Sequence, residues 1–128
     1  MTFRTADIAR LARSAHAAVE ETGTGATIYA ATSKRGRYVV GGVVPARMYP
    51  IGEAPAALRA GARRMLALPG ADRAETLGYW EDRGTVYLDL GDTWDDLTSA
   101  LAVATARMEL AIYDTRTGQC ISVPAVAA

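Results

Sequence analysis

Paired strand patterns around glycine-containing turns constrain the fold of this chain more than any other feature. Runs rich in β-branched and aromatic residues on both sides of such a turn are typical of β-hairpins. The C-terminal half has two of them: residues 77–81 and 85–90 around the turn 82–84, and residues 110–114 and 119–123 around the turn 115–118. Because the strands of a hairpin pair antiparallel, we expect an antiparallel sheet.

Alternation along residues 85–90 indicates how this sheet is buried. Val86, Leu88 and Leu90 alternate with more polar positions that include Tyr87 and Asp89. A strand with one apolar face packs that face on the core. We expect the leucine face to contact helices, and the face with Tyr87 to contact water or a partner.

Helical periodicity predicts three helices. The first covers residues 5–22, with Thr5 as its N-cap. The second covers residues 56–68, with Pro55 in its first turn. The third begins at an N-cap provided by Asp92 or Thr93 and has an apolar stripe at positions 97, 100, 101 and 104.

The N-terminal half adds one further hairpin to this order. Residues 27–30 and 37–40 are β-rich and flank a turn at 33–36. Residues 45–55 contain three prolines and are expected to form a connecting loop. The predicted fold is therefore α+β, in the order α-ββ-α-ββ-α-ββ, with the helices on one face of an antiparallel sheet. We expect a single domain over residues 1–128, with a frayed tail at 124–128.

Composition excludes several broad classes of protein. Half of the 128 residues are apolar and 22% are charged, as in an ordinary globular domain. Fourteen basic residues balance fourteen acidic ones, which argues against a strongly basic nucleic-acid coat. The single cysteine, Cys120, has no partner for an intramolecular disulfide. With no apolar run long enough for a signal peptide or a membrane span, we expect a cytoplasmic protein that does not bind membranes.

Side chains for catalysis are scarce. The chain has one histidine, His16, and one cysteine, Cys120, which are too few for a zinc site. A nucleophile needs a base within hydrogen-bond reach, and nothing in the sequence favours a contact between these two residues. Glycine-containing segments do not match a phosphate-binding loop either. We expect no catalytic residues and no cofactor, and therefore no enzyme.

Four aspartates that lie close in sequence leave one alternative open: Asp89, Asp92, Asp95 and Asp96. Together they are a candidate ligand set for a divalent cation, and hence for a small metal-dependent enzyme. Their spacing does not match a calcium-binding loop. We favour a structural role, because carboxylates at the start of a helix bond to its free N–H groups.

Charge is divided between the two halves of the chain. Residues 1–64 have ten basic and four acidic residues, a sum of +6, and residues 65–128 have four basic and ten acidic residues, a sum of −6. The candidate basic patch consists of Lys34, Arg35, Arg37, Arg59, Arg63 and Arg64. Such a patch is able to bind nucleic acid, and opposite poles permit self-association or steering toward a charged partner.

Apolar side chains in unexpected places are the candidates for protein contact. Met48, Tyr49 and Ile51 lie in the proline-containing loop, and they either fold back on the core or anchor a partner. Trp80 and Trp94 flank the acidic region. These five residues form our set of interaction candidates.

The segment from Gly78 to Val123 resembles small accessory proteins of actinobacteria, their phages and integrated elements. The resemblance rests on the strand Val86-Tyr87-Leu88-Asp89, the acidic helix start, the alanine-rich helix and the strand Ile112-Tyr113-Asp114 with Thr117-Gly118. It implies no activity and no catalytic residue. It implies an inhibitor or adaptor that binds a host protein, for example one of a host-defence system. A nucleic-acid-binding protein is the first alternative, and a metal-dependent enzyme is the second.

Overall fold

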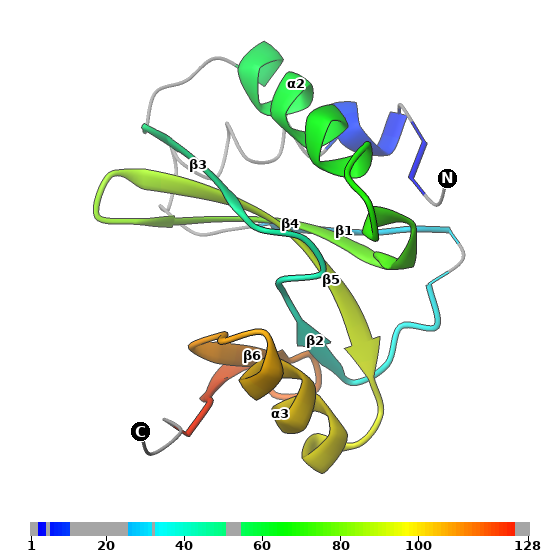
Figure 1. Cartoon of the computed structure of the whole chain (residues 1–128), viewed down its shortest axis with the longest axis vertical. Helices are drawn as coiled ribbons and strands as arrows, with labels where there is room; N and C mark the ends of the chain where they lie inside the picture. The colour runs from blue at the N-terminus through cyan, green and yellow to red at the C-terminus, as the bar shows by residue number, and fades with distance from the viewer. Residues whose placement is uncertain (1–2, 5, 11–25, 32, 51–54, 125–128) are drawn as a thin grey trace.

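The computed structural model describes residues 3–4, 6–10, 26–31, 33–50 and 55–124. It confirms an α+β fold with a seven-stranded antiparallel sheet (Figure 1). Residues 6–10 are helical. The other elements are β1 (Ala26–Tyr29), β2 (Tyr38–Val40), β3 (Arg47–Pro50), α2 (Pro55–Leu66), the 3₁₀ helix η1 (Ala71–Arg73), β4 (Thr76–Asp82), β5 (Thr85–Trp94), α3 (Leu97–Ala106), β6 (Ala111–Asp114) and β7 (Gln119–Ser122).

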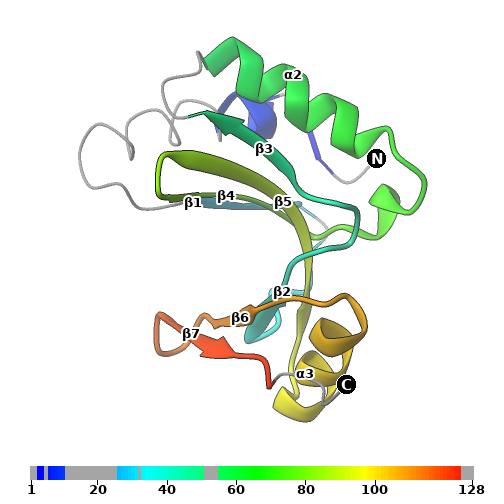
Figure 2. The same cartoon turned by 60° about the vertical axis from the view of Figure 1, so that its left-hand side comes forward.

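Strand β5 is the centre of the architecture. Its first residues pair with β4 on one side and with β3 on the other, and its last three residues pair with β2. β1 extends the sheet beyond β4, and β6 and β7 extend it beyond β2. We call β1, β3, β4 and α2 the α2 unit, and β2, β6, β7 and α3 the α3 unit. Figure 2 shows the two units at opposite ends of β5.

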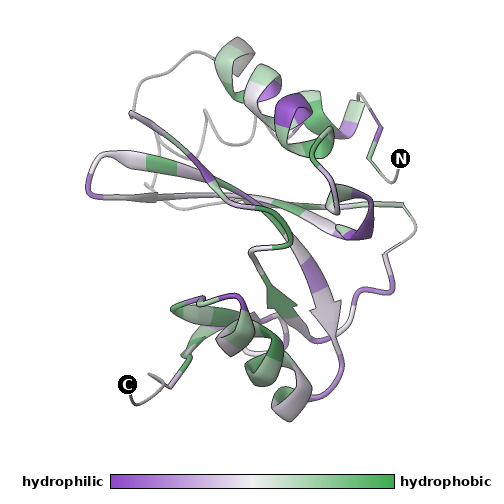
Figure 3. Cartoon of the chain, viewed as in Figure 1, coloured by the Kyte–Doolittle hydropathy of each residue, from purple (hydrophilic) through white to green (hydrophobic). Residues whose placement is uncertain are grey.

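Each unit has its own buried cluster. In the α2 unit, Met65 of α2 packs with Leu88 and Leu90 of β5, all fully buried. In the α3 unit, Ala104 of α3 packs with Val40 and other apolar side chains of β2 and β6. Figure 3 shows the hydrophobic colour concentrated along β2 and α3. A domain of this size thus divides its core between two ends of one strand.

Both C-terminal hairpins are confirmed. β4 and β5 pair in register, and β6 and β7 do the same. In the first turn Arg83 has a φ of 51° and Gly84 a φ of 82°. Positive φ at both central positions matches the twist of hairpin strands, and glycine adopts it without a steric penalty. Local turn chemistry therefore determines both pairings.

The predicted hairpin in the N-terminal half is wrong. Residues 26–29 and 38–40 do form strands, but β1 pairs with β4, whereas β2 pairs with β5 and β6. The intervening segment bonds to other elements: Ser33 donates to Glu75, and the Gly36 N–H donates to the hydroxyl of Thr93. Long-range pairing has replaced the local turn.

The proline-containing loop also differs from its prediction. Residues 47–50 form β3, whose partner strand among the described residues is β5. Prolines are tolerated on an edge strand, because that strand leaves one side of its backbone unpaired. The added strand breaks the predicted alternation of one helix with one hairpin.

Helix α2 forms as predicted, whereas α3 begins later than predicted. β5 continues through Trp94, so neither Asp92 nor Thr93 caps the helix. Asp96 is the N-cap, and its carboxylate accepts from the backbone N–H and the hydroxyl of Ser99, each at 2.8 Å. These bonds lower the pKa of Asp96. Among the described residues, no helix is long and apolar enough to cross a membrane.

Candidate docking surface

A row of three large side chains crosses the α2 unit on the sheet face opposite α2. In the strand register, Met48 of β3 lies opposite Tyr87 of β5, and Tyr87 lies opposite Trp80 of β4. Directly opposed residues share a face of the sheet. The rings of Trp80 and Tyr87 stack with centroids 4.2 Å apart and planes 13° apart. We call these three residues the aromatic row.

The aromatic row is accessible. Met48 is 65% exposed and Trp80 is 45% exposed, while Tyr87 is half-buried between them. Neighbouring positions on the other face of β5, such as Val86 and Leu88, are buried. Strand alternation therefore separates a packed face from an open one, as the sequence pattern predicts.

The other interaction candidates occupy different environments. Tyr49 packs on the core of the α2 unit, and its hydroxyl lies so close to Gly61 of α2 that a Cβ there would overlap it. Trp94 packs on the core of the α3 unit, and its indole N–H donates to Asp92 at 2.9 Å. Ile51 lies outside the described residues. Tyr49 and Trp94 thus pack on the two cores, whereas Met48 and Trp80 are exposed and remain interaction candidates.

Two carboxyl groups meet beside the aromatic row. Asp89 follows Tyr87 on the open face of β5, and Glu109 lies between α3 and β6. Both approach Gly41: a Cβ there would overlap Asp89 Oδ2 and would lie 2.6 Å from Glu109 Oε1. Only glycine leaves room at this point for both oxygens. We call Asp89 and Glu109 the carboxyl pair.

Burial and mutual repulsion act on the carboxyl pair. Burial raises the pKa of Asp89, although the Gly42 N–H, which donates to Asp89 Oδ1 at 3.0 Å, opposes this rise. Burial and the nearby charge of Asp89 raise the pKa of Glu109. Arg107 lowers both pKa values, without reversing either shift.

Arg107 forms its ion pair with a different carboxylate, that of Asp92. It makes two bonds to Asp92, at 2.8 and 2.7 Å, and it also donates to the carbonyl oxygen of Gly41 at 3.1 Å. Such a two-point ion pair fixes the guanidinium in one orientation. Among the ion pairs between described residues, none includes Asp89 or Glu109. Within the described part of the chain, the carboxyl pair therefore has a neighbouring cation but no ion-pair partner of its own.

The four aspartates proposed as an alternative metal site point to different partners. Asp92 binds Arg107, Asp96 caps α3, Asp95 is exposed, and Asp89 lies against Glu109. In the described part of the chain, no group of three or more His, Cys, Asp or Glu side chains is arranged to hold a metal ion. The helix-start role predicted for the cluster applies to Asp96.

The basic residues are spread over two elements. Arg37 binds both carboxylate oxygens of Asp114 at 2.9 Å, which lowers the pKa of Asp114, and Arg35 lies 4.7 Å from the ring centre of Tyr29. Lys34 is exposed in the same loop. The other three belong to α2, where Arg63 and Arg64 are exposed and Arg59 is half-buried. Figure 1 shows the loop before β2 well separated from α2.

The two residues considered for nucleophilic chemistry gain no support. Cys120 is exposed on β7. His16 lies outside the described residues. Sequence analysis missed Glu109, because its position depends on contacts across the fold. It also missed the pairing of Trp80 with Tyr87, because the expected turn at 82–84 is one residue longer than the observed one and shifts the register.

Comparison with known proteins adds no functional information. No protein-family model, curated protein or solved structure matches this chain. Function must therefore be inferred from the site itself.

Proposed function

We propose that this chain is a non-enzymatic protein-interaction module that binds a partner protein through the aromatic row. The observation that carries the proposal is the in-register, exposed arrangement of Met48, Tyr87 and Trp80 on the face opposite α2. Tyrosine and tryptophan are the residues that most often dominate binding energy at interfaces. Methionine adapts its shape to different partner surfaces.

The alternation of β5 supports an open face in its first half, around Tyr87. Val86, Leu88 and Leu90 belong to the core under α2, and Trp94, at a position of the same parity, belongs to the core under α3. The prediction that the helices lie on one face of the sheet, which is part of this proposal, leaves the face with Tyr87 available to a partner.

The observations favour a protein over the two alternatives. Arg37 already binds Asp114, and the carboxyl pair beside the aromatic row repels phosphate groups. The described aspartates do not converge on one point, which weakens the case for a metal-dependent enzyme. The role of a cytoplasmic inhibitor or adaptor from a phage or mobile element, acting on a host protein, is part of this proposal and rests on the resemblance of residues 78–123.

Affinity capture from an actinobacterial lysate with matched variants tests this function. The baits are the unaltered chain, Met48→Ser, Trp80→Ser and Leu68→Ser. Leu68 is 40% exposed and follows α2, so its substitution removes a comparable apolar surface away from the aromatic row. We expect one protein to be retained by the unaltered chain and by Leu68→Ser, and to be lost with the other two baits. Equal recovery of every captured protein with all four baits would contradict the proposal.

A further inference from the structure

We infer that the partner segment bound by this face is basic as well as apolar, with an arginine or lysine side chain against Asp89 and Glu109 and an apolar side chain on the aromatic row. This inference rests on the proposed function and specifies the chemistry of the partner. It is argued from the position, the charge and the surroundings of the carboxyl pair.

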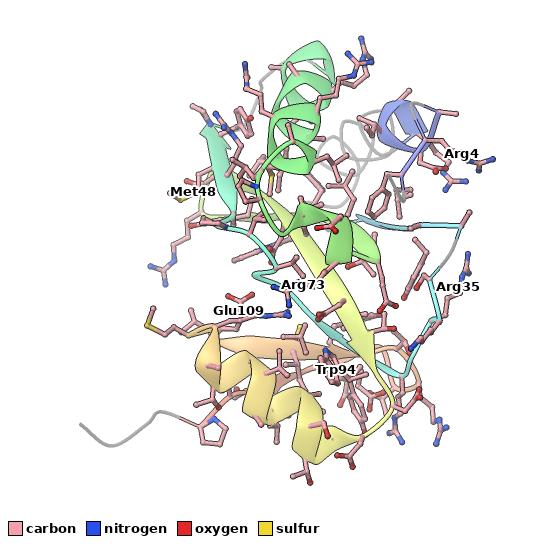
Figure 4. All side chains as sticks on the ribbon, turned by 45° about the vertical axis from the view of Figure 1, so that its right-hand side comes forward. Arg4, Arg35, Met48, Arg73, Trp94 and Glu109 are labelled. Atoms are coloured by element: carbon pink, nitrogen blue, oxygen red, sulfur yellow. The ribbon has the colours of Figure 1, made fainter. Side chains whose placement is uncertain are left out.

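The carboxyl pair and the aromatic row lie on one surface of the molecule. Asp89 is the next residue after Tyr87 on the open face, and in the register it lies opposite Gly78, which has no side chain to cover it. Glu109 lies between Met108 and Leu110, which are each 87% exposed. Figure 4 shows Met48 and Glu109 on the same side of the molecule. A segment that covers the aromatic row thus passes close to both carboxyl groups.

In the free protein, the two negative charges of the carboxyl pair are electrostatically unfavourable. Two carboxylates that approach the same point repel each other, and partial burial removes water that would screen them. Arg107, the described cation that acts on both groups, is held by Asp92. The raised pKa values of Asp89 and Glu109 reflect this incomplete compensation. A cation supplied by a partner would remove the repulsion at the moment of binding.

A binding role is the simplest explanation for a fold that holds two such carboxyl groups together. Groups held in an unfavourable state are commonly found where a protein binds or reacts. Two carboxylates suit a guanidinium or ammonium group, which forms short, charge-assisted hydrogen bonds, and the described residues add no third His, Cys, Asp or Glu to them as a metal ligand. Met108 and Leu110, the sequence neighbours of Glu109, are exposed apolar side chains of the kind that cover the aliphatic stem of lysine or arginine.

Selection from a random peptide library against the immobilised full-length chain tests this inference. We expect the enriched peptides to contain an arginine or lysine near a tryptophan, leucine or another large apolar residue. A synthetic peptide with the enriched sequence should bind more weakly as salt concentration rises, because part of the attraction is electrostatic. Enriched sequences without basic residues, or no enrichment at all, would overturn the inference.

Four variants identify which part of the surface the synthetic peptide uses. Asp89→Asn combined with Glu109→Gln should weaken binding about tenfold or more, and Trp80→Ser should do the same. Asp72→Asn, a charge removed from exposed η1, and Leu68→Ser should stay within about twofold of the unaltered chain. Circular dichroism confirms that each variant is folded.

The outcomes separate this inference from the proposed function. If Trp80→Ser abolishes peptide binding while the double carboxyl variant binds normally, the aromatic row remains a docking surface and the inference of a basic partner is wrong. If the peptide binds Trp80→Ser as well as it binds the unaltered chain, the aromatic row does not dock it, and the inference fails together with that part of the proposed function.

Discussion

At the scale of single residues, Asp89 and Glu109 make stability depend on pH. Both have a pKa above the ordinary carboxyl value, so the folded chain holds these protons more tightly than the unfolded chain does. Their contribution to stability is therefore most favourable below about pH 4, the ordinary carboxyl range, and is lost as pH rises through the raised values. At neutral pH, the carboxyl pair therefore lowers the stability of the free protein relative to its contribution below about pH 4.

Neutralising the carboxyl pair should therefore stabilise the protein at high pH. We expect Asp89→Asn and Glu109→Gln each to raise the urea midpoint of unfolding at pH 8, because an amide removes both the repulsion and the burial of charge. At about pH 3, where the carboxyl groups are protonated, the difference from the unaltered chain should nearly vanish. Asp72→Asn, at an exposed site, is the control and should shift neither midpoint. A lower midpoint for both amide variants at pH 8 would contradict this interpretation.

At the scale of elements, Gly91 allows β5 to serve both units. A Cβ on Gly91 would lie 2.8 Å from the carbonyl oxygen of Val40 and 2.6 Å from the hydroxyl of Thr76. One contact is with backbone of β2, so it has little freedom to move aside. Gly91 lies at the point in β5 where the pairing with β4 ends and the pairing with β2 begins.

We expect Gly91→Ala to reduce the free energy of unfolding by about 2 kcal/mol, the usual penalty for forcing extra volume into a packed site. Gly78→Ala is the matched control, because a Cβ there would find its nearest neighbour at 3.6 Å. Its effect should stay below about 1 kcal/mol. Chemical denaturation followed by circular dichroism measures both. Equal effects would show that the close approach at Gly91 is not limiting.

Elements formed by local contacts were predictable from sequence, and those formed by distant contacts were not. The turns at Arg83-Gly84 and Gly118 specify their hairpins through neighbouring residues, and Pro55 correctly indicated the start of α2. The partners of β1 and β2 lie dozens of residues away, so alternation predicted the strands but not their pairing. β3 was missed because prolines exclude a central strand without excluding an edge strand.

The candidate site, too, was predictable where it depends on local sequence patterns and not where it depends on distant contacts. Alternation along β5 placed Tyr87 and Asp89 on the open face, and unusual apolar residues indicated Met48 and Trp80. The meeting of Asp89 with Glu109 depends on how the loop after α3 packs on Gly41, which no local pattern encodes. Asp92 appeared to be a helix cap, but its partner Arg107 lies at the far end of α3.

At the scale of the whole molecule, one shared strand should make the two units unfold together. Trp80 lies in β4 of the α2 unit, and Trp94, the last residue of β5, packs on the core of the α3 unit. Trp80→Phe and Trp94→Phe therefore yield two proteins that each report on one unit. A single domain of this size is expected to unfold in one cooperative transition.

We expect Ile112→Ala, a cavity in the core of the α3 unit, to reduce stability by about 3 kcal/mol. Fluorescence in denaturant should show this shift equally with either tryptophan as reporter, although Ile112 lies only in the α3 unit. Cys120→Ala, at an exposed site, is the control and should change stability by about 0.5 kcal/mol or less. If the Trp80 signal keeps its original midpoint, the two units are independent.

The pairing order of the strands has a consequence for synthesis on the ribosome. β1, β2 and β3 all lie before residue 51, and their partner strands in described structure begin at Thr76 or later. A growing polypeptide must therefore carry three unpaired strands, with their backbone donors and acceptors open, until most of the message has been translated. Such segments are prone to pair with one another or with other chains. The efficiency of expression should then depend on elongation rate and on chaperones that bind emerging chains.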